Sequence, residues 1–224
     1  MKVIWLGQAG LLFETENIKI VIDPYLSNAC YKHNPANDRR MPVEKRFLDI
    51  DVDIYAVTHC HSDHLDPETM PYYLDRENSV LFLGPTSVWE SAKKQGGNNQ
   101  YVMFNRRTTW TYRGIKLTAV KAEHSDPHAI GIILDDGDKK YYITGDTLYN
   151  ETIFEDVPDD IYAVFLPING AGNNMNMADA ARFAKRTGAQ KVIPLHWGLF
   201  DSIDPKEFVC GNKTIPQIYQ QIDL

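Results

Sequence analysis

Residues 58–66 read THCHSDHLD and place three histidines and two aspartates within nine positions. Alternate side chains of an extended segment lie on the same side, so His59 and His61 can converge on one point. A turn after this pair can direct Asp63 and His64 toward a second point beside the first. The stretch therefore predicts the beginnings of two metal sites. A solvated polar turn is the alternative interpretation of the same residues.

Three more potential metal ligands stand where apolar, strand-like runs end. They are His124 in VKAEHSD, Asp146 in YYITGDT and His196 in VIPLHWG. A solvated turn at residues 58–66 does not explain them, whereas a metal centre at the edge of a sheet does. Imidazole and carboxylate suit zinc, iron and manganese alike, so the sequence leaves the metal open. We therefore predict a metal centre assembled from distant segments.

The chain alternates strand-like runs with fewer helix-like ones. The first three runs are separated by Gly or Asn, which favours an antiparallel meander. The strand-like runs are residues 2–6, 10–15, 18–23, 53–59, 79–84, 108–112, 115–124, 129–136, 139–146, 160–168 and 190–196. A strand-rich first half with helices, followed by a second half of similar order, predicts two β-sheets packed together with helices outside.

Helices are expected at four places. The best defined spans residues 177–187, because its apolar residues recur at helical spacing and Gly188 can close its end. A second covers residues 85–95, a third follows Asp66 as its N-cap, and a fourth lies in the C-terminal segment. Residues 25–50 are rich in Asn, Pro and charge, so we expect a long irregular loop, of the kind that is often functional.

Composition limits the class of protein. A chain of 224 residues with 43% hydrophobic residues is long enough for one core, so we expect a single domain over residues 1–224. The net charge of −7 argues against general affinity for nucleic acid or an anionic membrane. The N-terminus lacks the apolar core of a signal peptide and no apolar run reaches membrane-spanning length, so we expect a cytoplasmic protein. A homo-oligomer stays open.

Five features together carry a resemblance to a known family. They are the H-x-H-x-D-H string at residues 59–64, Asp23 after a strand, His124, GDT at 145–147 and PLHWG at 194–198. Together they resemble the metallo-β-lactamase-fold hydrolase superfamily, and the resemblance extends over nearly the whole chain. It implies an α+β fold of four layers, an αββα sandwich with a two-metal centre at one edge.

The resemblance also implies a ligand set for two divalent metal ions: zinc, manganese or iron. By motif position the first ion would be held by His59, His61 and His124, the second by Asp63, His64 and His196, and Asp146 would bridge them. Asp63 and Asp146 would also serve in catalysis. Asp23 would orient the metal ligands without binding a metal ion itself.

Two metal ions about 3.5 to 4 Å apart can share a water and lower its pKa from about 15.7 toward 7, which makes hydroxide the expected nucleophile. The charge of the ions exceeds that of Asp63, Asp146 and the hydroxide by about one unit, which favours an anionic small-molecule substrate. His128 could contact substrate or protonate a leaving group, and Asn169 could face the metal edge. An exposed loop histidine is the simpler interpretation of His128, and a turn residue before Gly170 is an equal alternative for Asn169.

Residues 166–200 resemble the ascorbate-6-phosphate lactonase-like branch, through an Asn-Gly after a strand, a Met-Asn-rich helix start and a Pro-x-His-x-x-x-Phe ending. This implies a lactone or ester of a phosphorylated sugar-like metabolite as substrate. A phosphodiesterase or nuclease with the same two-metal centre is an alternative, although nuclease relatives generally add a large insertion or a basic surface. A non-catalytic metal-binding protein of the same fold is a second alternative.

Overall fold

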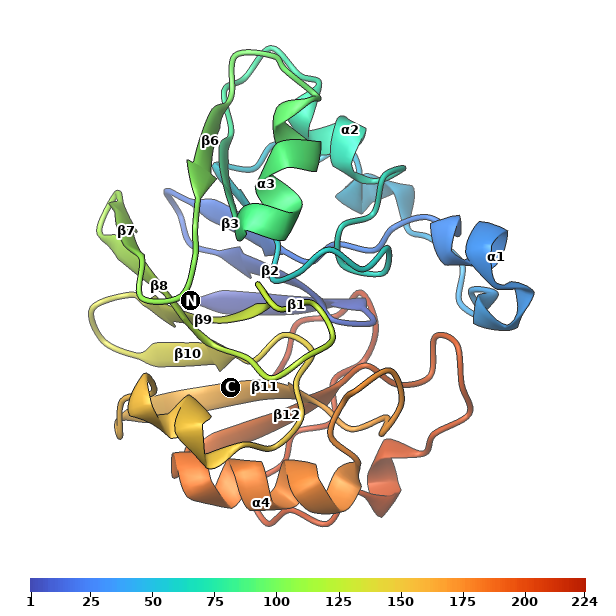
Figure 1. Cartoon of the computed structure of the whole chain (residues 1–224), viewed down its shortest axis with the longest axis vertical. Helices are drawn as coiled ribbons and strands as arrows, with labels where there is room; N and C mark the ends of the chain where they lie inside the picture. Colours follow the sequence, from blue (N-terminus) through green and yellow to red (C-terminus); the bar gives the residue numbers. More distant parts are fainter.

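Two six-stranded β-sheets lie face to face in the structure, a computed structural model that describes all of residues 1–224 (Figure 1). The first sheet contains, in spatial order, β1 (Lys2–Gly7), β2 (Gly10–Glu14), β3 (Lys19–Ile22), β4 (Ile54–Ala56), β5 (Leu81–Gly84) and β6 (Gln100–Met103). The second contains β12 (Lys191–Leu195), β11 (Ile161–Pro167), β10 (Lys140–Ile143), β9 (Ile130–Asp135), β8 (Ile115–Lys121) and β7 (Thr109–Tyr112).

Each sheet starts along the chain with antiparallel pairs and ends with parallel ones. β1, β2 and β3 form the predicted antiparallel meander, and β3, β4, β5 and β6 are parallel. The second sheet repeats this order, antiparallel from β7 to β10 and parallel from β10 to β12. Because parallel strands end at the same edge of a sheet, the loops that follow β3, β4, β10 and β12 come together there.

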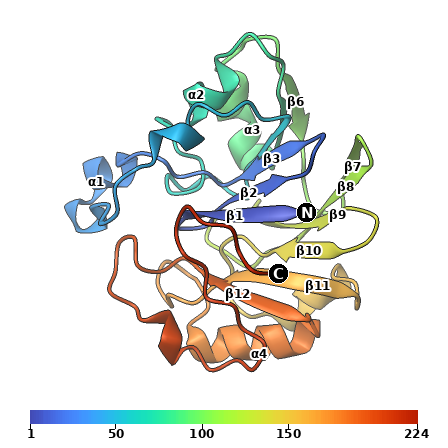
Figure 2. The same ribbon diagram turned by 180° about the vertical axis from the view of Figure 1, so that it is seen from behind.

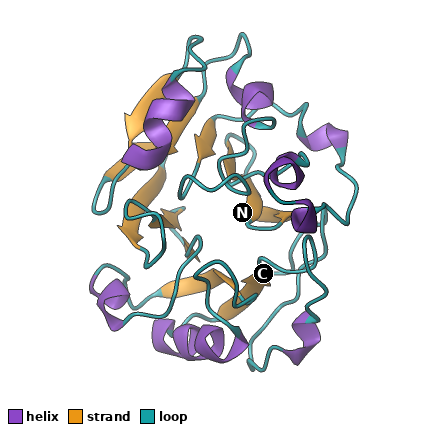
Figure 3. Cartoon of the chain, turned by 45° about the vertical axis from the view of Figure 1, so that its right-hand side comes forward, coloured by secondary structure: helices purple, strands orange, loops and turns teal.

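Helices cover the two outer faces of the paired sheets. α2 (Met70–Leu74) and α3 (Thr86–Lys93) lie on the first sheet and α4 (Met177–Thr187) lies on the second (Figures 1 and 3). A cluster of 25 buried apolar residues fills the space between the sheets, and a separate cluster lies under the helices on each side. This confirms the predicted αββα sandwich.

β10 shows how the sequence builds these layers. Its alternate residues Tyr141 and Ile143 belong to the core between the sheets, whereas Tyr142 belongs to the layer under α4. The ring of Tyr142 lies 6.0 Å from that of Phe183 on α4, measured between ring centroids. Both faces of this strand are therefore buried, as expected for the parallel part of a two-sided sheet.

The helix predicted near residues 177–187 is confirmed as α4. Asn176 is its N-cap, and the side chain accepts a hydrogen bond from the backbone N–H of Asp179 at 2.9 Å. Gly188 follows the helix with φ of 67°, a left-handed conformation that glycine adopts without strain.

Replacing Asn176 with alanine should lower the free energy of unfolding by about 1 kcal/mol, because the first turn of α4 loses its capping acceptor. Urea unfolding followed by far-UV circular dichroism measures this change. An Asn176→Asp variant, which keeps the acceptor, should recover most of the loss. Equal losses in the two variants would contradict the capping role.

The sequence-based description of residues 25–50 as an irregular loop is only partly right. The segment contains α1 (Ala29–His33) and two short 3₁₀ helices, η1 (Pro35–Asn37) and η2 (Lys45–Phe47). Each is too short to show a hydrophobic period in the sequence. Arg39 ties the segment down, because its guanidinium donates to the carbonyl of Tyr25 at 2.7 Å and to the hydroxyl of Tyr219 at 2.6 Å.

The helix expected after Asp66 begins later, at Met70. The Asp66 carboxylate instead accepts hydrogen bonds from the hydroxyls of Ser27 and Thr69 and from the backbone N–H of Glu68. These contacts hold residues 66–69 in a turn and link it to the 25–50 segment. The Asp66 carbonyl also accepts the backbone N–H of Met70 at 3.0 Å, so Asp66 caps the turn that leads into α2 and anchors this turn to the 25–50 segment.

The C-terminal segment is not the predicted helix, apart from the 3₁₀ turn η4 (Pro205–Glu207). It runs beside β1 instead (Figure 2), where the backbone N–H groups of Tyr219 and Ile222 donate to the carbonyls of Trp5 and Val3. The open edge of β1 needs hydrogen-bond partners, and that need outweighs the local preference for helix.

Two other elements lay outside the sequence-based expectations. β6 was not expected, because an exposed edge strand has no buried face to impose an alternating pattern. The 3₁₀ helix η3 (Glu151–Glu155) follows β10. None of the helices combines the length and apolar character needed to cross a membrane.

Candidate metal centre

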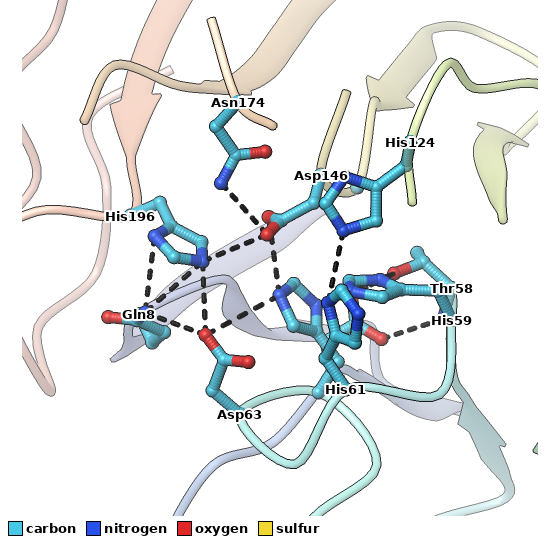
Figure 4. Close-up of polar contacts among 12 residues, drawn as sticks. Gln8, Thr58, His59, His61, Asp63, His124, Asp146, Asn174 and His196 are labelled. Carbon is cyan, nitrogen blue, oxygen red and sulfur yellow. Dashed lines mark hydrogen bonds and ion pairs between the residues drawn. The ribbon is translucent and has the colours of Figure 1, made fainter. Parts of the chain in front are cut away.

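The seven predicted metal ligands meet at the edge of the sandwich where the parallel strands end (Figure 4). The ligands from the 58–66 stretch follow β4, Asp146 follows β10 and His196 follows β12. His124 comes from the loop after β8. Tertiary structure thus brings together four segments that are far apart in the sequence.

The first group consists of His59, His61 and His124, whose ring nitrogens lie within 4.8 Å of one another. His59 Nε2 and His124 Nε2 are each 3.1 Å from Nδ1 of His61. Three imidazoles that point their nitrogens at one spot form an arrangement suited to a zinc-like ion.

The second group consists of Asp63, His64 and His196, again within 4.8 Å. His196 Nε2 lies 3.1 Å from Oδ2 of Asp63 and 3.2 Å from Oδ2 of Asp146. The other oxygen of Asp146, Oδ1, is 3.2 Å from Nε2 of His64. Asp146 also forms a group with His59 and His64, so it lies between the two sites.

The electrostatics of the cluster favour bound cations. Burial opposes charge on His64, but the carboxylates of Asp146, Asp23 and Asp63 outweigh it and raise its pKa well above the usual range. The same balance of burial and carboxylates raises the pKa of His196 to about 10. The ionised carboxylates thus hold protons on His64 and His196, at positions where a metal ion would supply the compensating positive charge.

Unpaired buried atoms test whether metal ions fit here. His64 Nε2 and Asp146 Oδ1 are buried and lie 3.2 Å apart, but they do not meet hydrogen-bond geometry and neither has another partner. Side-chain oxygens of Asn169 and Asn174 beside them are also unpaired. Buried polar atoms without partners are rare and costly, and a divalent cation would satisfy the imidazole and the carboxylate. The residues present therefore fit the predicted metal ions.

Asp23 occupies the supporting position that the resemblance implies. It is fully buried, and its Oδ1 accepts the backbone N–H of Thr58 at 2.7 Å. Its Oδ2 accepts the Thr58 hydroxyl at 2.6 Å and lies 2.8 Å from Nδ1 of His64. Asp23 therefore orients His64 and the start of the histidine stretch without facing the pocket.

Of the two weaker candidates from the sequence, Asn169 and His128, the structure places only one at the site. Asn169 is at the site, with its Nδ2 3.0 Å from Nδ1 of His196. His128 is not: it is exposed and lines a separate hollow beside Arg106 and Lys121. The turn at residues 126–128 directs it away, because the Asp126 carboxylate accepts the backbone N–H of His128 at 2.8 Å. His128 therefore does not line the pocket over the candidate ligands, in agreement with its simpler interpretation as an exposed loop histidine.

Gln8 is a residue of the site that sequence reasoning missed. It follows β1 in a left-handed conformation with φ of 51°, and it is buried. Its amide Nε2 donates to Oδ2 of Asp63 at 2.8 Å and lies 3.1 Å from both ring nitrogens of His196. The sequence did contain a sign of this role, because Gln8 is a polar residue between glycines in LGQAG and interrupts an otherwise apolar hairpin.

Asp126 and Asn174 were also missed. The Asp126 carboxylate accepts the Ser87 hydroxyl at 2.6 Å and the backbone N–H of Cys60 at 3.1 Å, so it ties the histidine stretch to α3. Asn174 donates from Nδ2 to Oδ2 of Asp146 at 2.8 Å. No pattern in the sequence marks Asp126, because its partners come from two distant segments.

A pocket of about 510 Å³ opens over the metal ligands. Its walls include Cys30 and Asn37 from the 25–50 segment, Phe200 after β12, and residues 171–174. The 25–50 segment and part of residues 166–200, which resemble the lactonase-like branch, thus line the same pocket. The walls are mainly amide, carboxylate and small apolar groups.

Comparison with known proteins places the chain in a family. Residues 19–197 match the family model described as "Beta-lactamase superfamily domain". A protein from Methanobrevibacter smithii called "UPF0173 metal-dependent hydrolase" is 29% identical, over all of this chain and 92% of its own length.

Solved structures show the same fold. A possible metal-dependent hydrolase from Veillonella parvula superposes with a TM-score of 0.80 at 19% identity, over 100% of this chain and 99% of that one. Igni18, a metallo hydrolase from Ignicoccus hospitalis, superposes with a TM-score of 0.78 at 20% identity, over 98% of this chain and 96% of that one.

Proposed function

Because this chain belongs to the beta-lactamase superfamily and is a metal-dependent hydrolase of that fold, we propose that it uses two divalent metal ions to open a lactone or related ester bond. The observation that carries the proposal is the convergence of two adjacent ligand groups on Asp146. The first ion would be held by His59, His61 and His124, the second by Asp63, His64 and His196, with Asp146 between them.

Bound metal ions would lower the pKa of a water and polarise the carbonyl oxygen of the substrate. The protein's own groups handle the proton. Asp63 uses Oδ2 for its contacts with Gln8 and His196, which leaves Oδ1 to accept a proton from the attacking water. The water oxygen bonds to the carbonyl carbon, the ring or ester C–O bond breaks, and the leaving alkoxide takes up the proton.

The pocket walls support a small polar substrate. Amide side chains of Asn37, Asn169 and Asn173 line the pocket and can exchange hydrogen bonds with hydroxyl groups. Phe200 offers an apolar face for a ring. A sugar-like lactone presents both kinds of surface, and its phosphorylated form remains the first substrate to test. A phosphate would rely on the metal ions for positive charge, because no Lys or Arg lines this pocket.

A substrate screen tests the proposal. Protein loaded with zinc, manganese or iron is assayed against sugar lactones with and without phosphate, phosphodiesters and thioesters, with chelator-treated protein as the matched control. We expect turnover of a lactone or ester that disappears on chelation and returns when metal is added. A clear preference for phosphodiesters would favour the nuclease-type alternative. Tight metal binding without any turnover would favour the non-catalytic alternative.

A further inference from the structure

The loop between β11 and α4 contacts ligands of both candidate metal sites. Residues 169–174, which we call the asparagine loop, read NGAGNN and carry three asparagines. Asn169 lies against His196, Asn173 against His124, and Asn174 against Asp146. Figure 4 shows Asn174 reaching Asp146 from the side opposite Asp63. One short segment thus contacts one ligand from each group and the carboxylate between them.

Asn169 faces the ring nitrogen of His196 that points away from the carboxylates. Nε2 of His196 lies beside Asp63 and Asp146, so it is the nitrogen that would bind a metal ion. In a neutral imidazole that binds through Nε2, Nδ1 carries the proton and needs an acceptor.

Only the side-chain oxygen of Asn169 can serve as this acceptor. Its amide is 3.0 Å from Nδ1, and its Oδ1 has no other partner. A half-turn of the Asn169 amide exchanges the positions of Oδ1 and Nδ2, and Oδ1 then faces Nδ1 of His196. Gln8 cannot replace it, since its nearby amide nitrogen is a donor already engaged with Asp63.

His124 is supported by the same loop through the backbone. Its Nε2 faces His61, and its Nδ1 lies 3.2 Å from the carbonyl oxygen of Asn173. Asn173 has φ of 64°, a left-handed conformation that asparagine tolerates better than most residues. The carbonyl oxygen accepts the Nδ1 proton and leaves Nε2 free for a metal ion.

Asn174 acts as a hydrogen-bond donor, whereas Asn169 acts as an acceptor. Its Nδ2 donates to Oδ2 of Asp146 at 2.8 Å, so it must present a donor rather than an acceptor. The loop is held by its own backbone, because Gly170 N–H donates to the Met175 carbonyl and Met175 N–H donates to the Thr147 carbonyl. Thr147 directly follows Asp146, so the loop and the shared ligand are joined.

We propose that the asparagine loop positions the metal ligands, with Asn169 as acceptor for His196, the Asn173 carbonyl as acceptor for His124, and Asn174 as donor to Asp146. The inference rests on the proposed two-metal site. It concerns metal affinity and not the identity of the substrate, so it does not depend on which ester is cleaved.

Aspartate substitutions at the two side-chain positions give opposite predictions. Asn169→Asp keeps an acceptor for His196 and should retain metal affinity within a few-fold of the wild type. Asn174→Asp replaces a donor with a carboxylate beside Asp146 and should weaken metal binding about 10- to 100-fold, as losses of such supporting contacts do. Asn169→Ala should weaken binding by a similar factor. Asn176→Ala is the matched control, because its side chain caps α4 and contacts no ligand.

Metal affinity is measured with zinc, by competition against a chromophoric chelator. Thermal unfolding followed by circular dichroism verifies that each variant is folded.

The proposal would be supported if Asn169→Asp retains zinc affinity while Asn169→Ala and Asn174→Asp lose it. Wild-type affinity in Asn169→Ala, equal losses in both aspartate variants, or an equal loss in Asn176→Ala would overturn it. If Asn174→Asp does not fold, Asn174→Leu replaces it, and wild-type affinity there would count against the proposal. A wild-type protein that binds no zinc, manganese or iron would overturn both this inference and the proposed function.

Discussion

Replacing Asp146 with alanine should lower kcat/KM by about 10³-fold or more, because a loss of about 4 kcal/mol of transition-state stabilisation corresponds to that factor. Asp146 is buried, and its two oxygens face different histidines: Oδ1 is 3.2 Å from His64 Nε2, and Oδ2 is 3.2 Å from His196 Nε2. The alanine variant removes the carboxylate that lies between the two ligand groups and has an oxygen within 4.8 Å of a histidine nitrogen of each. Steady-state kinetics on the best substrate of the screen measures the effect.

The same variant should bind fewer metal ions per chain than the wild type, measured by elemental analysis after gel filtration. Asp159→Asn is the matched control, because it neutralises an exposed carboxylate far from the ligands and should leave kcat/KM unchanged. Turnover by Asp146→Ala at the wild-type rate would rule out the bridging role. A loss that also occurs in Asp159→Asn would point to general electrostatics instead.

Replacing Asp23 with alanine should lower the free energy of unfolding by about 3–5 kcal/mol and weaken metal binding at the same time. The change leaves the backbone N–H and hydroxyl of Thr58 and the Nδ1 of His64 without their buried acceptor. A buried donor without an acceptor costs about 1–3 kcal/mol, and breaking a buried charged pair costs about 3–5 kcal/mol. Urea unfolding of the metal-free protein measures the stability change.

Asp66→Ala separates the two consequences of removing Asp23. Asp66 is also a fully buried carboxylate with three hydrogen bonds, but none of its partners is a histidine. We expect Asp66→Ala to lower stability while zinc affinity stays closer to that of the wild type. Equal zinc affinities in the two variants would show that Asp23 acts through general stability and does not orient His64.

Local patterns predicted elements whose apolar residues recur in a short run or at a regular spacing. The spacing of small and apolar residues predicted α4, and the first three strands were expected as a meander. The same reasoning failed for the C-terminal segment, which pairs with β1 instead of forming a helix. A pattern of local residues carries no information about an open strand edge elsewhere in the fold.

The histidine stretch determined the type of chemistry by itself. Its residue types and spacing, with His124, Asp146 and His196 at the ends of strands, predicted a metal centre before any geometry was known. The sequence could do this because imidazole and carboxylate are the groups that bind such metal ions. It did not fix where they point, because the strand expected to reach His59 ends at Ala56 and residues 58–64 form bends and a turn.

The tertiary structure alone decided which groups support those ligands. Gln8, Asp126 and Asn174 reach the site from three segments, and His128, although only four residues from His124, turns away. Hydrogen-bond partners depend on distances between segments that meet only after the two sheets have packed. The sequence therefore identified the candidate ligands of this protein, whereas the packing of the sheets and loops determined their hydrogen-bond partners and the pocket above them.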